Sequence, residues 1–158
     1  MEVDLKNKPK DLLDLNPYAK VPVLVDEGGV VYESAIVDEY LEEQYPSVRL
    51  LPADSAQRAR IRIWIDFFNT RIHPAAHDMT RDKNPERAKE QMAKYLEALE
   101  NEMFDKRFIV GDYSLADITF IPFYVRRKRY GVAIDEKLPN LKRWGEELIA
   151  RPAVAATL

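Results

Sequence analysis

The sequence contains no cysteine, and this absence excludes several kinds of chemistry at once. Without cysteine, the 158 residues form no disulfide, bind no metal through a thiolate and offer no thiol nucleophile of their own. Long apolar runs are also missing, since none approaches the roughly 18 residues that a membrane span requires. The opening residues, 1–6, lack a basic-then-apolar pattern, so neither a signal peptide nor a transit peptide is visible.

The chain also lacks a strong excess of one charge. It carries 24 Lys and Arg against 27 Asp and Glu, a formal net charge of −3, whereas a dedicated nucleic-acid binder would carry a basic footprint. With 5 glycines and 46% apolar residues, the composition is neither collagen-like nor disordered. Residues 1–50 hold 5 basic and 11 acidic side chains, a net of −6, and the remainder hold 19 and 16, a net of +3. This contrast indicates two modules.

The first 46 residues predict a strand, a connection, a hairpin and a helix. A short strand is expected at 2–5 and a short helix or irregular connection at 9–15. The β-runs at 21–25 and 30–32 are separated by a glycine turn, which indicates a hairpin. From Ser34 the apolar spacing becomes helical, and this helix is expected to stop at Tyr45 and Pro46.

The rest of the chain is helical in character. Asp54 or Ser55 can cap a first helix, which is expected to end or bend near His73 and Pro74. Further helices are predicted from Asn84-Pro85, from Leu115 to about Tyr130, and from Leu138-Pro139. A capping box is expected between Ser114 and Asp117, because each side chain can accept a backbone N–H that the helix end leaves free.

Two histidines stand four residues apart, at His73 and His77, which is the spacing of a helical metal pair. Asp78 is the one further ligand type beside them, and Pro74 lies in the same turn. The sequence therefore favours ordinary surface or packing histidines, and no metal is expected.

A basic run at 126–129 can attract an anion or a partner, although its expected place at a helix C-terminus explains it without a ligand. Aromatic side chains of the helical part can line an apolar pocket or fill the core, and their helical spacing favours the core. They are Trp64, Phe67, Phe68 and Tyr124, of which Phe67 stands beside the apolar stripe and is the better candidate for a pocket.

Glu33 and Ser34 stand at the predicted junction between the second strand and its helix. A serine there is usually a structural cap, yet free N–H groups at a helix start also suit a carboxylate. The Glu33 side chain can hold an ammonium group. The pair would thus suit the zwitterionic end of an amino acid or of a γ-glutamyl group.

The segment 16–24, NPYAKVPVL, and the segment 32–41, which begins YESAI and ends YL, resemble the N-P-x-G-x-V-P-x-L and E-S-x-A-I-x-x-Y-L signatures of the cytosolic glutathione transferase family. The segments 111–118, 138–141 and 151–154 are similar to its helix-capping and C-terminal motifs. Ala19 departs from the pattern, which commonly has glycine there. Residues 5–9 favour the omega-like, stringent-starvation-like branch.

This resemblance implies an α+β protein with a truncated thioredoxin-like domain followed by an all-α domain. The expected boundaries are 1–48 for an incomplete glutathione-binding domain and 53–158 for the helical domain. Val21 and Pro22 would form a cis peptide that exposes the Val21 backbone to the cysteinyl residue of glutathione. Glu33 and Ser34 would take the γ-glutamyl ammonium and carboxylate.

Lys8 and Lys20 would meet the glycyl carboxylate of glutathione. The family's first strand and helix, which supply the Cys, Ser or Tyr that activates the glutathione sulfur, are expected to lie before Met1. No residue of this chain is therefore assigned to catalysis, and activity of this chain alone is expected to be impaired.

The resemblance further implies a cytoplasmic homodimer that acts on glutathione and a small electrophile or disulfide, without a membrane or nucleic-acid partner. The alternative is a non-enzymatic interaction module of the stringent-starvation-like type, which docks on a protein such as RNA polymerase. An unpaired sheet edge would suit such docking.

Overall fold

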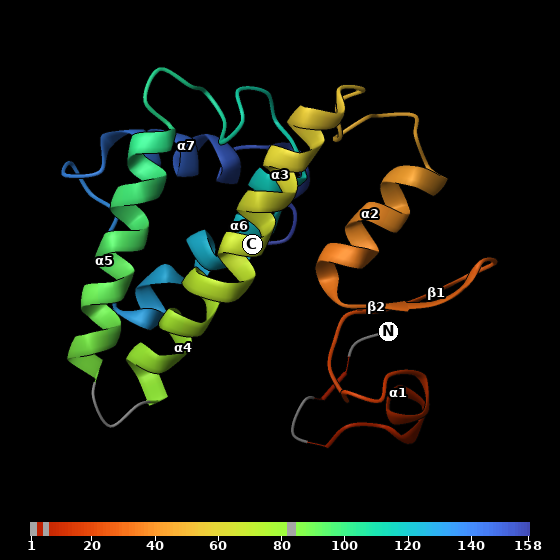
Figure 1. Ribbon diagram of the computed structural model, residues 1–158. Helices are drawn as coiled ribbons and strands as arrows, with labels where there is room; N and C mark the ends of the chain where they lie inside the picture. Colours follow the sequence, from red (N-terminus) through yellow and green to blue (C-terminus); the bar gives the residue numbers. More distant parts are fainter. Residues whose placement is uncertain (1–2, 5–6, 82–84) are drawn as a thin grey trace. The chain divides into compact units, whose positions relative to one another are not determined.

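A computed structural model describes residues 3–4, 7–81 and 85–158, shown in Figure 1. The chain divides into two compact units, an N-terminal unit of Met1–Arg49 and a C-terminal unit of Leu50–Leu158. Of the strand expected at 2–5, Val3 and Asp4 are not in a strand, and the other two positions lie outside the described residues. Among the described residues, no helix is long and apolar enough to cross a membrane.

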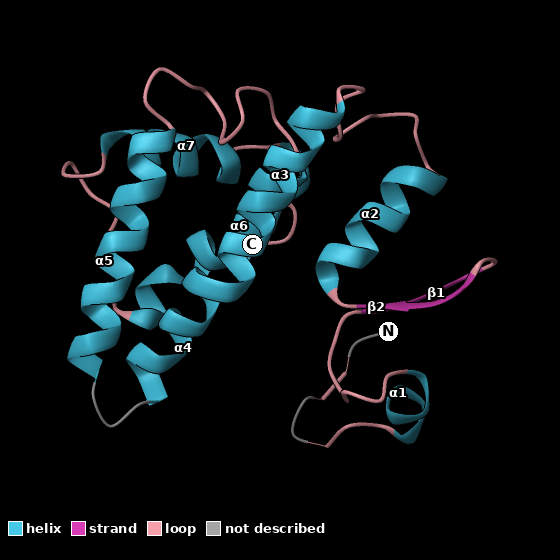
Figure 2. Ribbon diagram, in the orientation of Figure 1, coloured by secondary structure: helices cyan, strands magenta, loops and turns pink. Residues whose placement is uncertain are grey.

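The N-terminal unit is built on a β-hairpin, drawn in magenta in Figure 2. Its elements are α1 (Lys10–Leu15), β1 (Val23–Asp26), β2 (Gly29–Tyr32) and α2 (Ser34–Gln44). The strands pair antiparallel from Val23 opposite Tyr32 to Asp26 opposite Gly29. The predicted hairpin and the helix after it are confirmed. β1 begins later than expected, after Pro22, which has no N–H to contribute to a ladder.

The side chain of Asp26 ties the hairpin to the end of α2. Its carboxylate accepts hydrogen bonds from the hydroxyl groups of Tyr40 at 3.2 Å and Tyr45 at 2.9 Å. The Glu27 N–H first, and then the Tyr45 hydroxyl, lower the pKa of Asp26 because they stabilise its charged form. The hairpin turn and the helix C-terminus are thereby held together by polar contacts.

The C-terminal unit is all helical. Its elements are α3 (Ser55–Phe67), the π-helical turn η1 (Phe68–Ile72), α4 (His73–Arg81), α5 (Pro85–Glu102), α6 (Leu115–Arg126), the 3₁₀ turn η2 (Arg127–Tyr130), α7 (Pro139–Ile149) and α8 (Pro152–Ala155). Asp54 caps α3, since its carboxylate accepts the Gln57 N–H at 2.7 Å. Pro85 begins α5 as predicted, whereas the expected cap at position 84 lies outside the described residues.

The first long helix does not end at His73 but continues into α4 through a π turn. The His73 N–H donates to the carbonyl of Phe68, five residues earlier. Pro74 has no N–H to give to the carbonyl of Thr70, and the Arg71 guanidinium donates to that oxygen instead, at 3.4 Å. This turn sets the start of α4 and thus the placement of its side chains.

The core of the C-terminal unit lies where α6 and α7 meet. Phe120 and Trp144 are fully buried with their ring centroids 5.8 Å apart. Gly145 allows the close approach of the two helices, because a Cβ atom there would lie 1.8 Å from Cε2 of Tyr124. The core placement of Phe68 and Tyr124, favoured by the sequence, is therefore confirmed, with 8% and 1% of each residue exposed.

Candidate functional site

The hairpin brings the two segments with the N-terminal motifs to one end of the sheet. Because Val23 pairs with Tyr32 in antiparallel register, the residues just outside the ladder, Pro22 and Glu33, lie at the same end of the hairpin. The Val21–Pro22 peptide bond is cis, and Val21 is 44% exposed. Within the described part of the chain, neither the N–H nor the C=O of Val21 takes part in a backbone hydrogen bond. An exposed backbone edge therefore lies at the end of the hairpin where Glu33 follows β2.

The loop that leads into the cis peptide is held by Asn16, which is 1% exposed. Its amide nitrogen donates to the carbonyl of Lys20 at 2.9 Å, and its side-chain oxygen accepts the Tyr18 N–H at 2.9 Å. The Ala19 N–H donates to the Asn16 carbonyl at 2.8 Å, and Ala19 has a φ of 53°. The sequence indicated only a turn at Asn16. Its burial could not be recognised, because the partners of its side chain are backbone atoms.

Glu33 occupies the N-cap position of α2, and Ser34 is the first helical residue, so the serine lies one position later than a cap. Glu33 has a φ of 68°, in the left-handed region that a non-glycine residue rarely adopts. Its carbonyl accepts the N–H groups of Ile36 and Val37. Among the described residues, its carboxylate and the Ser34 hydroxyl make no hydrogen bond or ion pair, and both residues are exposed. Two polar side chains are thus available at one helix start.

The electrostatics of this corner suit a zwitterion. The N–H groups of Ser34 and Ala35, at the start of α2, have no acceptor within the helix, and the helix dipole adds positive potential at this end. The Glu33 carboxylate supplies a negative charge directly beside them. Lys20 is exposed and adjoins the cis peptide, while Lys8 is exposed on the segment before α1. The hairpin thus places the segment 20–22, which leads into β1, and the segment 33–34, which follows β2, at the same end of the sheet, but it does not place Lys8.

In the C-terminal unit, the basic run lies at the end of α6 as expected. The Arg127 guanidinium donates to the carbonyl of Tyr124 at 2.7 Å and lies 4.0 Å from the centroid of its ring. Arg127 and Lys128 also line a cavity of about 320 Å³ together with residues 131–134. Phe67, the aromatic candidate for a pocket, is half-buried and makes edge contacts with the rings of Trp64 at 5.1 Å and Tyr95 at 5.6 Å.

Comparison with known protein families gives matches in both units. Residues 1–44 match the N-terminal domain of glutathione S-transferase, and residues 57–152 match its C-terminal domain. Glutathione S-transferase U25 of Arabidopsis thaliana is 35% identical over 166 residues, which cover 99% of this chain and 75% of that protein. The chain belongs to the glutathione S-transferase family.

Solved structures of this family have the same fold. The rice GST1 structure in complex with glutathione matches with a TM-score of 0.88 and 28% identity, covering 99% of this chain and 78% of that one. Glutathione transferase Omega 3C from Trametes versicolor matches with a TM-score of 0.85 and 27% identity, covering 100% and 76%. The predicted architecture, a thioredoxin-like N-terminal domain followed by an all-helical C-terminal domain, is confirmed.

The branch within the glutathione S-transferase family differs from the expectation. The Arabidopsis relative is named a U-type glutathione S-transferase, not an omega-type one. The sequence similarity to it therefore does not support the omega-like, stringent-starvation-like branch. Likeness to that class is found at the level of the fold, in the Trametes structure. The alternative of a non-enzymatic docking module depended on that branch and gains no support from these matches.

Proposed function

We propose that this chain binds glutathione at the hairpin end of the N-terminal unit, for conjugation to a small electrophile or for thiol transfer. The observation that carries the proposal is that the exposed backbone of Val21 and the Glu33–Ser34 helix start lie at the same end of the hairpin, and that the Val21 backbone and the side chains of Glu33 and Ser34 make no hydrogen bond within the described residues. The rice relative of known structure, which has the same fold, was solved in complex with glutathione.

The γ-glutamyl end of glutathione would bind at the start of α2. Its carboxylate would accept hydrogen bonds from the Ser34 hydroxyl and from the free N–H groups of the first helical turn. Its ammonium would pair with the Glu33 carboxylate. The left-handed φ of Glu33 supports this role, because a non-glycine residue held in that region is a mark of functional sites.

The remaining two residues of glutathione would follow the exposed backbone edge. The cysteinyl N–H and C=O would pair with the Val21 C=O and N–H, as an added strand pairs with a sheet edge. The glycyl carboxylate would then lie toward the ammonium groups of Lys20 and Lys8. We thus propose 1–48 as the domain that holds the peptide and 53–158 as the helical domain that follows it.

In the transfer itself, the glutathione thiol loses its proton, and the thiolate attacks an electrophilic carbon or a disulfide sulfur and displaces the leaving group. We propose that these 158 residues bind glutathione but contribute no group that activates its sulfur. The chain has no cysteine, and each of the site residues is assigned to a charged end or to the backbone of the peptide.

The binding site is tested by isothermal titration of the chain with reduced glutathione. Ser34→Ala is expected to weaken binding by about tenfold, because a hydrogen bond to a charged carboxylate is lost. Glu33→Gln is expected to weaken it by about fivefold, the size of an exposed ion pair. Helical content, followed by circular dichroism, should not change in either variant.

Matched controls come from the same kinds of position. Ser55 is the first residue of α3 as Ser34 is of α2, and Glu43 is an exposed glutamate of α2, so Ser55→Ala and Glu43→Gln should bind glutathione like the parent chain. Unchanged affinity in Ser34→Ala would contradict the proposed site. Efficient conjugation of an aromatic chloride by this chain would contradict the absence of an activating group, while leaving the binding site intact.

A further inference from the structure

The two histidines of the chain converge on one point beside α4. Nε2 of His73 and Nε2 of His77 lie 3.1 Å apart. Their ring centroids are 4.6 Å apart and the ring planes make an angle of 81°. The two Nε2 atoms are therefore closer to each other than the ring centres are. His73 is exposed and His77 is half-buried, which leaves the pair accessible to ions from solution.

We propose that His73 and His77 chelate one divalent transition-metal ion through their Nε2 atoms. An ion about 2.0–2.1 Å from each nitrogen would make an N–metal–N angle of about 98° at the observed separation of 3.1 Å. That angle lies between the square-planar and tetrahedral values, so either geometry needs little movement of the rings. Imidazole suits Cu²⁺, Ni²⁺ and Zn²⁺, and the usual order of stability places Cu²⁺ first.

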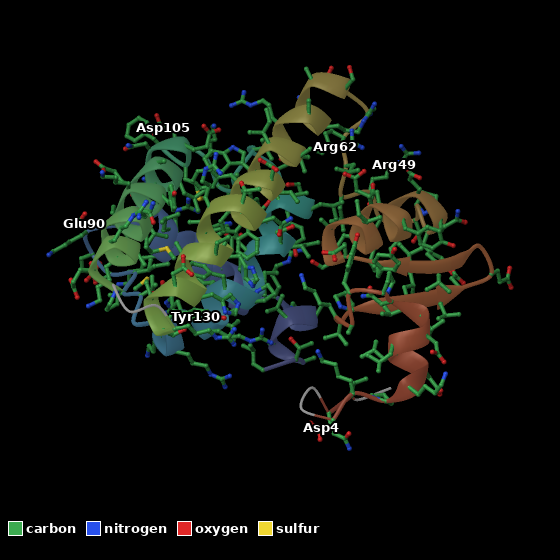
Figure 3. The ribbon with its side chains drawn as sticks, turned by 60° about the horizontal axis from the view of Figure 1, so that its bottom comes forward. Asp4, Arg49, Arg62, Glu90, Asp105 and Tyr130 are labelled. Atoms are coloured by element: carbon green, nitrogen blue, oxygen red, sulfur yellow. The ribbon has the colours of Figure 1, made fainter. Side chains whose placement is uncertain are left out.

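The fold holds both rings in this arrangement. α4 begins at His73 directly after the π turn, and its regular α-helical spacing places residues four apart on the same face. The Phe68 ring lies 6.0 Å from that of His73, and the Tyr130 ring lies 6.1 Å from that of His77. Figure 3 shows the labelled Tyr130 beside the ribbon of α4. Aromatic neighbours on both sides restrict the rings before an ion arrives.

A single proton lies between the two Nε2 atoms when the pair is neutral and holds no metal ion. In the metal-free neutral pair, one Nε2–H donates to the lone pair of the other Nε2. Chelation needs both lone pairs, so the donating ring must move its proton to its own Nδ1 through solvent. The neutral pair therefore binds the ion without net proton release.

The other coordination positions are left to water or to an added ligand. No group of three or more His, Cys, Asp and Glu side chains with metal-binding geometry occurs among residues 3–4, 7–81 and 85–158. Asp78 follows His77 directly, and adjacent residues of a helix do not share a face. The proposed site is therefore a two-histidine chelate with open positions.

The test uses the full chain without a histidine tag, so that these two imidazoles are the only ones present. Zn²⁺ is titrated while the side-chain nitrogen signals of ¹⁵N-labelled histidine are followed by NMR. Both Nε2 signals are expected to shift together and to saturate at one equivalent. Unmoved signals, or a shift of one histidine alone, would overturn the chelate.

Affinity measurements with Cu²⁺ provide a second, independent readout. His73→Ala and His77→Ala are each expected to weaken Cu²⁺ binding by about 100-fold, because the second ligand of a linked pair acts at a high effective concentration. Asp78→Asn is the matched control and should bind like the parent chain. Equal affinity in the parent chain and both alanine variants would place the ion elsewhere and overturn the proposal.

Discussion

At the scale of single residues, the Asp117 side chain accepts four hydrogen bonds. It is fully buried, and its Oδ2 accepts the Ser114 N–H at 2.9 Å and the Ser114 hydroxyl at 3.2 Å. Its Oδ1 accepts the Ile109 N–H at 3.1 Å and the Trp144 indole N–H at 2.9 Å. One carboxylate thus joins the start of α6 to a loop and to α7.

Replacement of this carboxylate should destabilise the C-terminal unit. Asp117→Asn would turn an amide group toward N–H or O–H donors, and the unfolding free energy is expected to fall by about 1–3 kcal/mol. Chemical denaturation monitored by tryptophan fluorescence measures this change. Asp112→Asn, at an exposed position nearby, should stay close to the parent chain. Equal losses in both variants would argue against a special role for the Asp117 network.

Asp117 should also affect how the unfolding free energy of the protein depends on pH. Burial raises the pKa of Asp117 above its ordinary value of 3.8, although the four donors oppose this shift. The folded state therefore keeps its proton to a higher pH than the unfolded state. The part of the stability that comes from this pKa difference is fully present below pH 3.8 and is lost as pH rises through the folded pKa. The difference in unfolding free energy between the parent chain and Asp117→Asn should narrow over that range.

At the scale of elements, α7 receives its N-terminal cap from another helix. Its own N-cap residue makes no side-chain capping bond. Instead, the Glu100 carboxylate of α5 accepts the Asn140 N–H at 2.9 Å, the Asn140 side-chain amide at 2.7 Å and the Leu141 N–H at 2.9 Å. The negative charge also suits the positive end of the α7 dipole.

Removal of this cap should loosen α7. Glu100→Ala is expected to lower the unfolding free energy by about 1–2 kcal/mol, the upper part of the range for lost caps. Glu97→Ala, at an exposed position on the same helix α5, is the matched control and should change stability little. Thermal unfolding followed by circular dichroism distinguishes the two. A larger loss for Glu97→Ala would refute the capping role.

At the scale of the whole molecule, the two units differ in how much core they hold. Among the described residues, the buried apolar side chains of the N-terminal unit are Leu12 and Val37, and the others belong to the C-terminal unit. A two-stranded hairpin is marginally stable without further packing. The N-terminal unit, which carries the proposed glutathione site, is therefore expected to be the less stable of the two.

Amide hydrogen exchange tests this difference. The amides of β1 and β2 are expected to exchange faster than those of α5, α6 and α7, because local opening costs less where little apolar surface is buried. Glutathione at about 100 times its Kd should slow hairpin exchange by about 100-fold through linkage. Ser34→Ala should show weaker slowing at the same concentration. Hairpin amides as protected as those of α5 without glutathione would contradict the expectation.

The sequence by itself determined the features that depend on neighbouring residues. Strand alternation and a glycine turn predicted the hairpin, and local capping signals predicted the helix starts at Asp54, Pro85 and Ser114. The family signatures placed the cis proline and the Glu33–Ser34 junction in order along the chain. Such signals are local, because backbone preferences and caps act within one or two turns.

Only the tertiary structure decided which distant groups meet. The contact of Asp117 with Trp144 and that of Glu100 with Asn140 join residues 27 and 40 positions apart. The strand register sets which residues of the two N-terminal motifs lie at the same end of the hairpin. The 3.1 Å distance between the two histidine Nε2 atoms depends on ring orientations that the sequence spacing does not specify. Long-range packing sets these distances, because the same local pattern permits many rotamers and registers until neighbouring elements exclude all but one.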